Sequence, residues 1–266
     1  MSGLLAQFLS SVAARWDRPG GPFDPHSGAK YMYSQIGDIS YKRLTRTITV
    51  PAGGANLSFW TSYNTEADWD HVFVEARTAG QDNWTTLPDA NGNTSQSTGE
   101  SCPAGWRDLH PQLDHYQTLN ADGTCSPTGT TGVWNAASGG SAGWQQWSVN
   151  LNAYAGTQVE VSIAYASDWA SQGLGVFVDD INVSTGEGTT SFEDDAVPMD
   201  GWEVTGPPPG SGPNPNNFVR TGSEGFPEGA VVATPHSLYA GFGFEGITGV
   251  ASRNAVMGRV LDHLLD

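Results

Sequence analysis

Five acidic residues are the clearest candidates for chemistry in this sequence of 266 residues. Three lie between two apolar runs in the first third of the chain, and two accompany a similar pair of runs further on: Glu66, Asp68, Asp70, Asp168 and Asp179. Carboxylate oxygens from several loops are the ligands that calcium prefers in proteins. The pattern predicts a calcium site. The alternative is a set of solvated turn residues, one of which caps backbone amides.

Asp179 has the most specific argument among the five. Strict alternation along 175–183 places it on the face shared by Phe177, Ile181 and Val183, which we expect to be buried. A buried carboxylate needs a partner, because burying it unpaired costs several kcal/mol. The chain has 11 Lys and Arg against 28 Asp and Glu, so a metal ion is a better expected partner than a basic side chain.

The histidines give little support for catalysis. None of the six stands in an HxxE or HExxH motif, so the sequence offers no catalytic zinc site. The segment HPQLDH supplies His110, Asp114 and His115 as conceivable metal ligands, but a loop of turn-forming residues explains it equally well. No GxSxG, GxGxxG or GxxxxGK motif occurs in the required context.

Composition restricts the partners and the compartment. A formal net charge of −17 with scattered basic residues argues against nucleic acid. No stretch reaches the roughly 18 to 20 apolar residues of a membrane helix.

Cys102 and Cys125 are expected to form a disulfide, as in a secreted or extracellular protein, with two free thiols as the alternative. The apolar start, LLAQFLSSVAA, lacks the basic residues of a signal peptide and is interpreted as a helix over 4–15.

The elements that position these residues are mostly strands. Residues 1–29 are expected to form a helix and linker, and 30–184 an antiparallel β-sandwich with hairpins at 57–77 and 159–183. A long excursion, 89–142, carries both cysteines. Residues 185–266 form an extension with a Pro/Gly-rich loop, and its terminal strand and amphipathic helix suggest an α/β layer that lacks its parallel neighbours.

Three stretches of the sandwich carry a family resemblance. They begin YSQIGDISYKRLTRTITVPAGG, GWQQWSVNLNAYAG and GLGVFVDDINV. Together they resemble the jelly-roll region near the C-terminus of immune inhibitor A-type metallopeptidases and secreted bacterial zinc carboxypeptidases. The resemblance implies a mainly β, jelly-roll fold downstream of a zinc peptidase domain, with the acidic turns as calcium ligands. The zinc-binding His and Glu residues of those enzymes have no counterpart here. The terminal strand and helix also resemble the end of a glutamine amidotransferase-like layer.

Two functions follow as hypotheses. The first is a non-catalytic accessory region of a secreted zinc metallopeptidase, stabilised by calcium, that aids stability or substrate engagement. Zinc would belong to the upstream peptidase domain, which would be its partner. The second is a free-standing module that binds a glycan or a protein through the long excursion and its aromatic side chains, since exposed members of the ten tryptophans would suit a sugar.

Overall fold

The computed structural model describes residues 24–186, 188–222, 231–234, 237–240 and 249–265. The chain divides into two compact units, Asp17–Gly222 and the terminal segments Met1–Trp16 with Ser223–Asp266. The helix expected over 4–15 lies outside the described residues.

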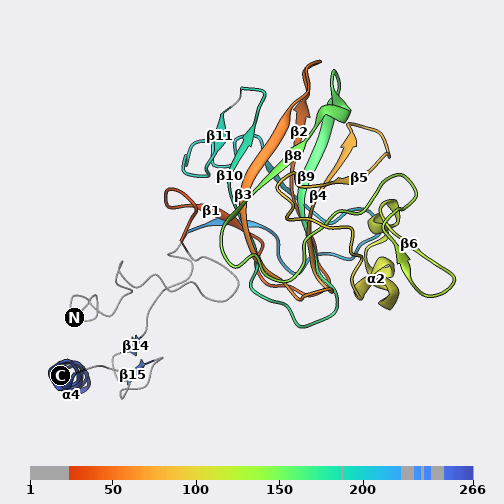
Figure 1. The fold of residues 1–266 in the computed structure, drawn as a ribbon. Helices are drawn as coiled ribbons and strands as arrows, with labels where there is room; N and C mark the ends of the chain where they lie inside the picture. The colour runs from red at the N-terminus through yellow and green to blue at the C-terminus, as the bar shows by residue number, and fades with distance from the viewer. Residues whose placement is uncertain (1–23, 187, 223–230, 235–236, 241–248, 266) are drawn as a thin grey trace. The chain divides into compact units, whose positions relative to one another are not determined.

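The larger unit contains two antiparallel sheets, as expected for a mainly β sandwich (Figure 1). The first has the order β13-β1-β10-β3-β8, with β11 also paired to β10. Its strands are β1 (Tyr31–Tyr33), β3 (Asn56–Asn64), β8 (Gln145–Asn150), β10 (Gly175–Val183), β11 (Thr189–Thr190) and β13 (Val219–Thr221).

The second sheet has the order β12-β2-β9-β4-β5. Its strands are β2 (Tyr41–Thr49), β4 (His71–Thr78), β5 (Thr85–Leu87), β9 (Gln158–Ala166) and β12 (Glu203–Thr205). Because β12 pairs with β2 and β13 with β1, the sandwich continues to residue 221 and does not end at 184 as the sequence suggested.

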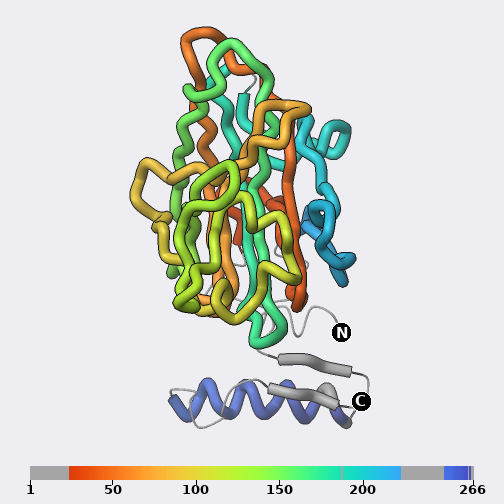
Figure 2. Tube along the Cα trace, turned by 90° about the vertical axis from the view of Figure 1, so that its right-hand side faces the viewer, coloured from red at the N-terminus to blue at the C-terminus, as the bar shows by residue number. Residues whose placement is uncertain are grey.

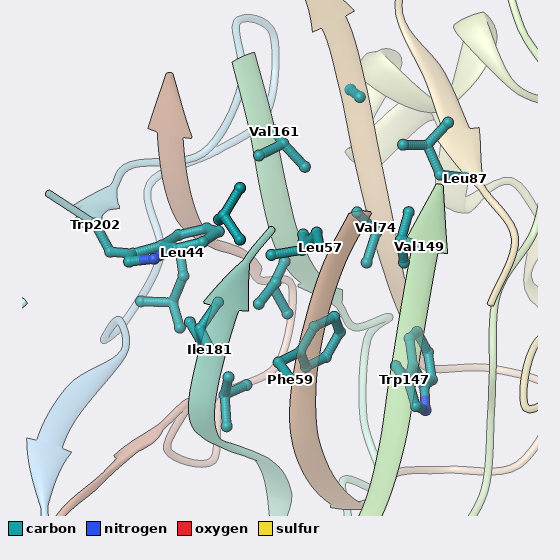
Figure 3. Packing of buried hydrophobic residues seen from close by; sticks show 14 of the residues in the cluster. Leu44, Leu57, Phe59, Val74, Leu87, Trp147, Val149, Val161, Ile181 and Trp202 are labelled. Atoms are coloured by element: carbon teal, nitrogen blue, oxygen red, sulfur yellow. The ribbon is translucent and has the colours of Figure 1, made fainter. Parts of the chain in front are cut away.

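The main core lies between the sheets (Figure 3). Leu57 and Phe59 of β3 lie opposite Val74 of β4 and Val161 of β9, and all four are buried completely. Alternation of apolar residues along each strand produces this layer, because successive side chains point to opposite faces. Trp202 closes the layer beside β12 with 2% of its surface exposed.

The two segments expected to be hairpins connect the sheets instead. β3 pairs with β10 and β8, whereas β4 pairs with β9 and β5, so the turn between β3 and β4 crosses from one sheet to the other. The turn between β9 and β10 crosses back in the same way. Strand pattern alone does not distinguish a hairpin from such a crossing, because both need two alternating runs and a polar turn. β3 pairs with β10, and β4 pairs with β9. The turn from β3 to β4 and the turn from β9 to β10 therefore lie at the same end of the sandwich, and their acidic residues meet there. We call this the loop end.

A second apolar cluster covers the outer face of the second sheet. It joins Phe73 of β4 and Ala164 of β9 to Trp106, Tyr116 and Trp134 of the excursion. The excursion contains α2 (Ser101–Ala104), α3 (Trp106–Leu109), the 3₁₀ helix η2 (Pro111–His115), β6 (Thr118–Leu119) and β7 (Cys125–Ser126). Figure 2 faces this excursion, whose yellow and green path lies in front of the strands. A sheet that is apolar on both faces requires such a cover.

The Cys102–Cys125 disulfide is confirmed, with a Cα–Cα distance of 6.3 Å. Cys102 is buried in the second cluster and Cys125 packs against it. The bridge therefore ties the β6–β7 hairpin to the helices that cover the sheet.

The smaller unit is described in part. β14 (Val231–Thr234) and β15 (Ser237–Ala240) pair antiparallel, and the expected terminal helix is α4 (Val250–Leu265). β15 therefore has an antiparallel partner from the chain just before it. None of the helices described is long and apolar enough to cross a membrane.

Candidate functional site

The loop end brings together four of the five predicted calcium ligands, Glu66, Asp68, Asp70 and Asp168. Asp70 is buried completely and accepts hydrogen bonds from Tyr165 Oη at 2.9 Å and from the Asp168 amide at 3.0 Å. Asp70 therefore joins the first crossing turn to the second. Burial raises the pKa of Asp70 to about 7, although these two hydrogen bonds oppose the shift.

Glu66 and Asp168 share one region of negative charge. Burial, followed by the charges of Asp168 and Asp38, raises the pKa of Glu66. Burial, and then the charge of Asp38, also raises the pKa of Asp168. Glu66 and Asp168 therefore both ionise less readily than exposed carboxyl groups, and an added cation would oppose this effect.

Asp38 was missed by the sequence analysis. It lies in the loop before β2, whose neighbour Ile39 donates its amide proton to the Asp168 carbonyl at 2.6 Å. Only the pairing of β2 with β9 brings this loop to the second crossing. No short-range motif signals that proximity.

Asp68 takes part through its backbone. Its carbonyl accepts hydrogen bonds from the amides of Glu100 and Ser101, which begin α2. Its φ of 67° is in the left-handed region, where Asp is tolerated better than most residues. Asp68 therefore anchors the excursion to the loop end.

Asp179 lies at a different place from the other four. It pairs with Trp60 in the middle of β3, four residues before Asn64, where β3 ends. At about 3.3 Å per residue, that is more than 10 Å along the strand from the loop end. The five predicted ligands therefore do not form one site.

Asp179 also faces away from the main core, contrary to the expectation from alternation. A bulge follows it in β10, and the register shifts between Asp179 and Asn182. Val176 and Val178 before the bulge and Ile181 after it all belong to the core between the sheets. An extra residue in a bulge reverses the side on which later residues fall, so strict alternation failed here.

Residues 24–30 cover Asp179. The Ser27 amide donates to its Oδ2 at 3.1 Å, and the Asp180 amide donates to its Oδ1 at 2.8 Å. Burial raises the pKa of Asp179 to about 7, and the adjacent Asp180 contributes to this rise. Hydrogen bonds rather than a basic side chain thus meet part of the cost of burial.

Two further carboxylates hold the same segment. Asp180 contacts His26 Nδ1 at 2.6 Å and accepts a hydrogen bond from Ser27 Oγ at 2.8 Å. Glu193 Oε1 accepts hydrogen bonds from the amides of Ala29 and Lys30 at 2.8 and 2.6 Å. Asp179, Asp180 and Glu193 form a second acidic group, which we call the covered group.

A buried lysine near the loop end was not anticipated. Lys42 has no exposed surface, and its ammonium donates to the carbonyls of Ser34 and Gln35 and to Asn216 Oδ1, at 2.9, 3.0 and 2.6 Å. Burial lowers the pKa of Lys42 to about 8, and the charge of Asp70 partly offsets this effect.

The residues of the HPQLDH segment are separated from one another. His110 Nε2 lies 2.9 Å from the Ser167 carbonyl, whereas His115 Nδ1 lies 2.8 Å from Thr131 Oγ1. Asp114 forms an ion pair with Arg107. Each residue has a separate structural partner.

The residue types at the loop end suit a hard cation, but their side chains are not arranged around one point. Glu66, Asp38 and Asp168 supply carboxylate oxygens, as calcium requires. Across the residues the structure describes, however, no three acidic, His or Cys side chains converge as metal ligands.

Comparison with known proteins gives one informative similarity. No family model matches the chain. It is similar to the Pre-pro-metalloprotease PrtV of Vibrio cholerae serotype O1, in strains M66-2 and ATCC 39315 / El Tor Inaba N16961. In both cases the identity is 27% over 178 residues.

The similarity is to part of a metalloprotease precursor. It covers 63% of this chain and 15% of the precursor, so the chain corresponds to a small fraction of its relative. This supports a metallopeptidase-associated region and says nothing about which kind of metallopeptidase.

Proposed function

We propose that this chain is a non-catalytic accessory region of a secreted zinc metallopeptidase of the carboxypeptidase or immune inhibitor A type. The similarity to a segment of a metalloprotease precursor carries the proposal. The disulfide supports an oxidising, extracellular location. The partner would be a peptidase domain, and zinc would bind there.

The architecture suits a stabilising or substrate-engaging role. Two sheets enclose one core, a disulfide-bonded excursion encloses a second, and both cores are dense in buried aromatic side chains. Within the excursion, His110 contacts the Ser167 carbonyl, and His115 contacts Thr131 Oγ1 and Asp82.

Calcium is proposed to bind the loop end through Glu66 and Asp168, assisted by Asp38. Asp70 would support the site by holding the Asp168 amide, and Asp68 by holding the excursion. Burial and, after it, neighbouring carboxylates raise the pKa of Glu66 and of Asp168, and a bound cation would favour the ionised form of both. Asp179 belongs to the covered group, so it would not be a ligand of this calcium site.

A peptidase assay tests the non-catalytic proposal. The purified chain, incubated with zinc and a set of peptide substrates, should release no amino acid or fragment. Hydrolysis that a chelator abolishes and zinc restores, in protein free of other peptidases, would contradict the proposal. Thermolysin assayed in parallel with the same substrates is the positive control.

A further inference from the structure

A groove lies on the outer face of the second sheet, beside the second apolar cluster. Its volume is about 360 Å³, within the range of small-molecule sites. Arg43 of β2, Glu160 of β9 and Arg77 of β4 line it from the sheet. Pro111 of the excursion and Pro209 of the Pro/Gly-rich segment also line it.

The ionic groups of this groove are paired. Arg77 contacts Glu160 at 2.8 Å, and His115 contacts Asp82 at 3.5 Å. Arg43 lies 3.6 Å from Glu75, a fully buried carboxylate just beneath the groove. The groove is lined by two carboxylates, Asp82 and Glu160, and by two guanidinium groups, Arg43 and Arg77. Because these opposite charges are equal in number, the groove favours a neutral ligand.

The same groups retain hydrogen-bonding capacity. Both Arg77 bonds to Glu160 end on Oε2, and among the described residues Oε1 of Glu160 accepts no hydrogen bond. Arg43 donates hydrogen bonds from Nε and Nη2 to the Gly206 carbonyl, and among the described residues its Nη1 donates none. Donors and acceptors therefore stand next to each other, as recognition of hydroxyl groups requires.

The backbone beneath the groove offers nothing to a peptide strand. β2 lies between β12 and β9, β9 between β2 and β4, and β4 between β9 and β5. Peptide recognition by strand addition needs an unpaired sheet edge, and none of these three strands supplies one. Recognition here must come from side chains.

We propose that this groove binds a neutral oligosaccharide. Its hydroxyl groups would bond to Glu160, Arg43 and Arg77, and the proline rings would contact the C–H faces of the sugar. Trp84 would not stack on the sugar, since it is 4% exposed and lies under the Arg77 guanidinium at 4.6 Å. The proposal is independent of the calcium site and of any peptidase.

Nuclear magnetic resonance of the ¹⁵N-labelled full chain tests it. Maltotriose, cellotriose and triacetylchitotriose are the probes, and the Nε–H signals of Arg43 and Arg77 report on the groove. At least one probe should shift these signals saturably, with a Kd of about 1 mM or tighter.

Two variants assign the site. Glu160→Gln should weaken binding about tenfold, since it removes a charged acceptor. Glu203→Gln, at an exposed position on β12 outside the groove, should leave the Kd unchanged. Thermal melting of both variants establishes that they fold. Absence of a saturable shift with all three sugars, or binding that Glu160→Gln does not weaken while the variant is folded, would overturn the proposal.

Discussion

Asp70 and Asp179 are carboxylates without exposed surface, and burial raises the pKa of each to about 7. The ordinary value, 3.8, applies to the unfolded chain. Between these values the folded protein holds protons that the unfolded chain has released. These two groups therefore make the free energy of unfolding of metal-free protein fall as pH rises from about 4 to about 7. His71 acts in the opposite direction, because burial lowers its pKa to about 4.

This dependence can be measured by urea unfolding in chelator at several pH values. Asp179→Asn should make stability decline less with pH than in wild type, because it removes one carboxyl group of raised pKa while keeping the size of the side chain. Asp108→Asn, at an exposed position in α3, is the control and should leave the slope unchanged. A decline of the same size in Asp179→Asn and wild type would show that Asp179 does not titrate as stated.

Lys42 gives a second prediction at this scale. Lys42→Met leaves three carbonyl oxygens without their hydrogen-bond donor. We expect the free energy of unfolding to fall by about 2 to 3 kcal/mol, because buried acceptors that lose a charged donor pay the cost of their desolvation. Lys30→Met, at a partly exposed position, should cost less than about 1 kcal/mol. Equal losses in the two variants, measured by urea unfolding, would contradict the role given to Lys42.

The sequence predicted that acidic turn residues would lie together, but it did not predict all the residues at the loop end. Asp70 and Asp168 stand in the turns of two similar strand pairs, and those turns do meet. Asp38 and Lys42 reach the same end through the pairing of β2 with β9, which no local pattern specifies. Asp179 was placed on the wrong face because one extra residue in a bulge cancels the alternation.

At the scale of elements, the crossings between sheets place the acidic turns side by side. β3 and β10 pair in one sheet and β4 and β9 in the other, so both crossings lie at the same end. The strands themselves were predictable from their alternation. Their assignment to sheets was not, because partners such as β2 and β9 are more than 100 residues apart in sequence.

The disulfide should stabilise the excursion. The bonded cysteines are 23 residues apart, and in the chain-entropy model a loop of that size contributes roughly 3 kcal/mol. Cys125→Ser with Cys102→Ala should lower the free energy of unfolding by about that amount, and protease should then cut first within 89–142. Wild-type protein with the bond intact should resist cutting there. Unchanged stability and cleavage pattern in the double variant would contradict this role.

At the scale of the whole molecule, the larger unit combines a sandwich core with a second core under the excursion. The excursion was expected to be a loop with almost no strand signal. Its aromatic residues, among them Trp106 and Trp134, instead complete the cover of the second sheet. The apolar run VFV in β4, which places Val72 and Val74 on one face and Phe73 on the other, was the signal that both faces are buried.

Thermal melting in calcium and in chelator tests the proposed calcium-stabilised sandwich most directly. A ligand that binds only the folded state stabilises it by about 2.7 kcal/mol at a hundredfold excess over its Kd. We predict that calcium raises the Tm of wild-type protein, that Asp168→Asn loses most of the rise, and that Asp108→Asn keeps it. An identical Tm for wild type in calcium and in chelator, with no tightly held ion by elemental analysis, would contradict the proposal.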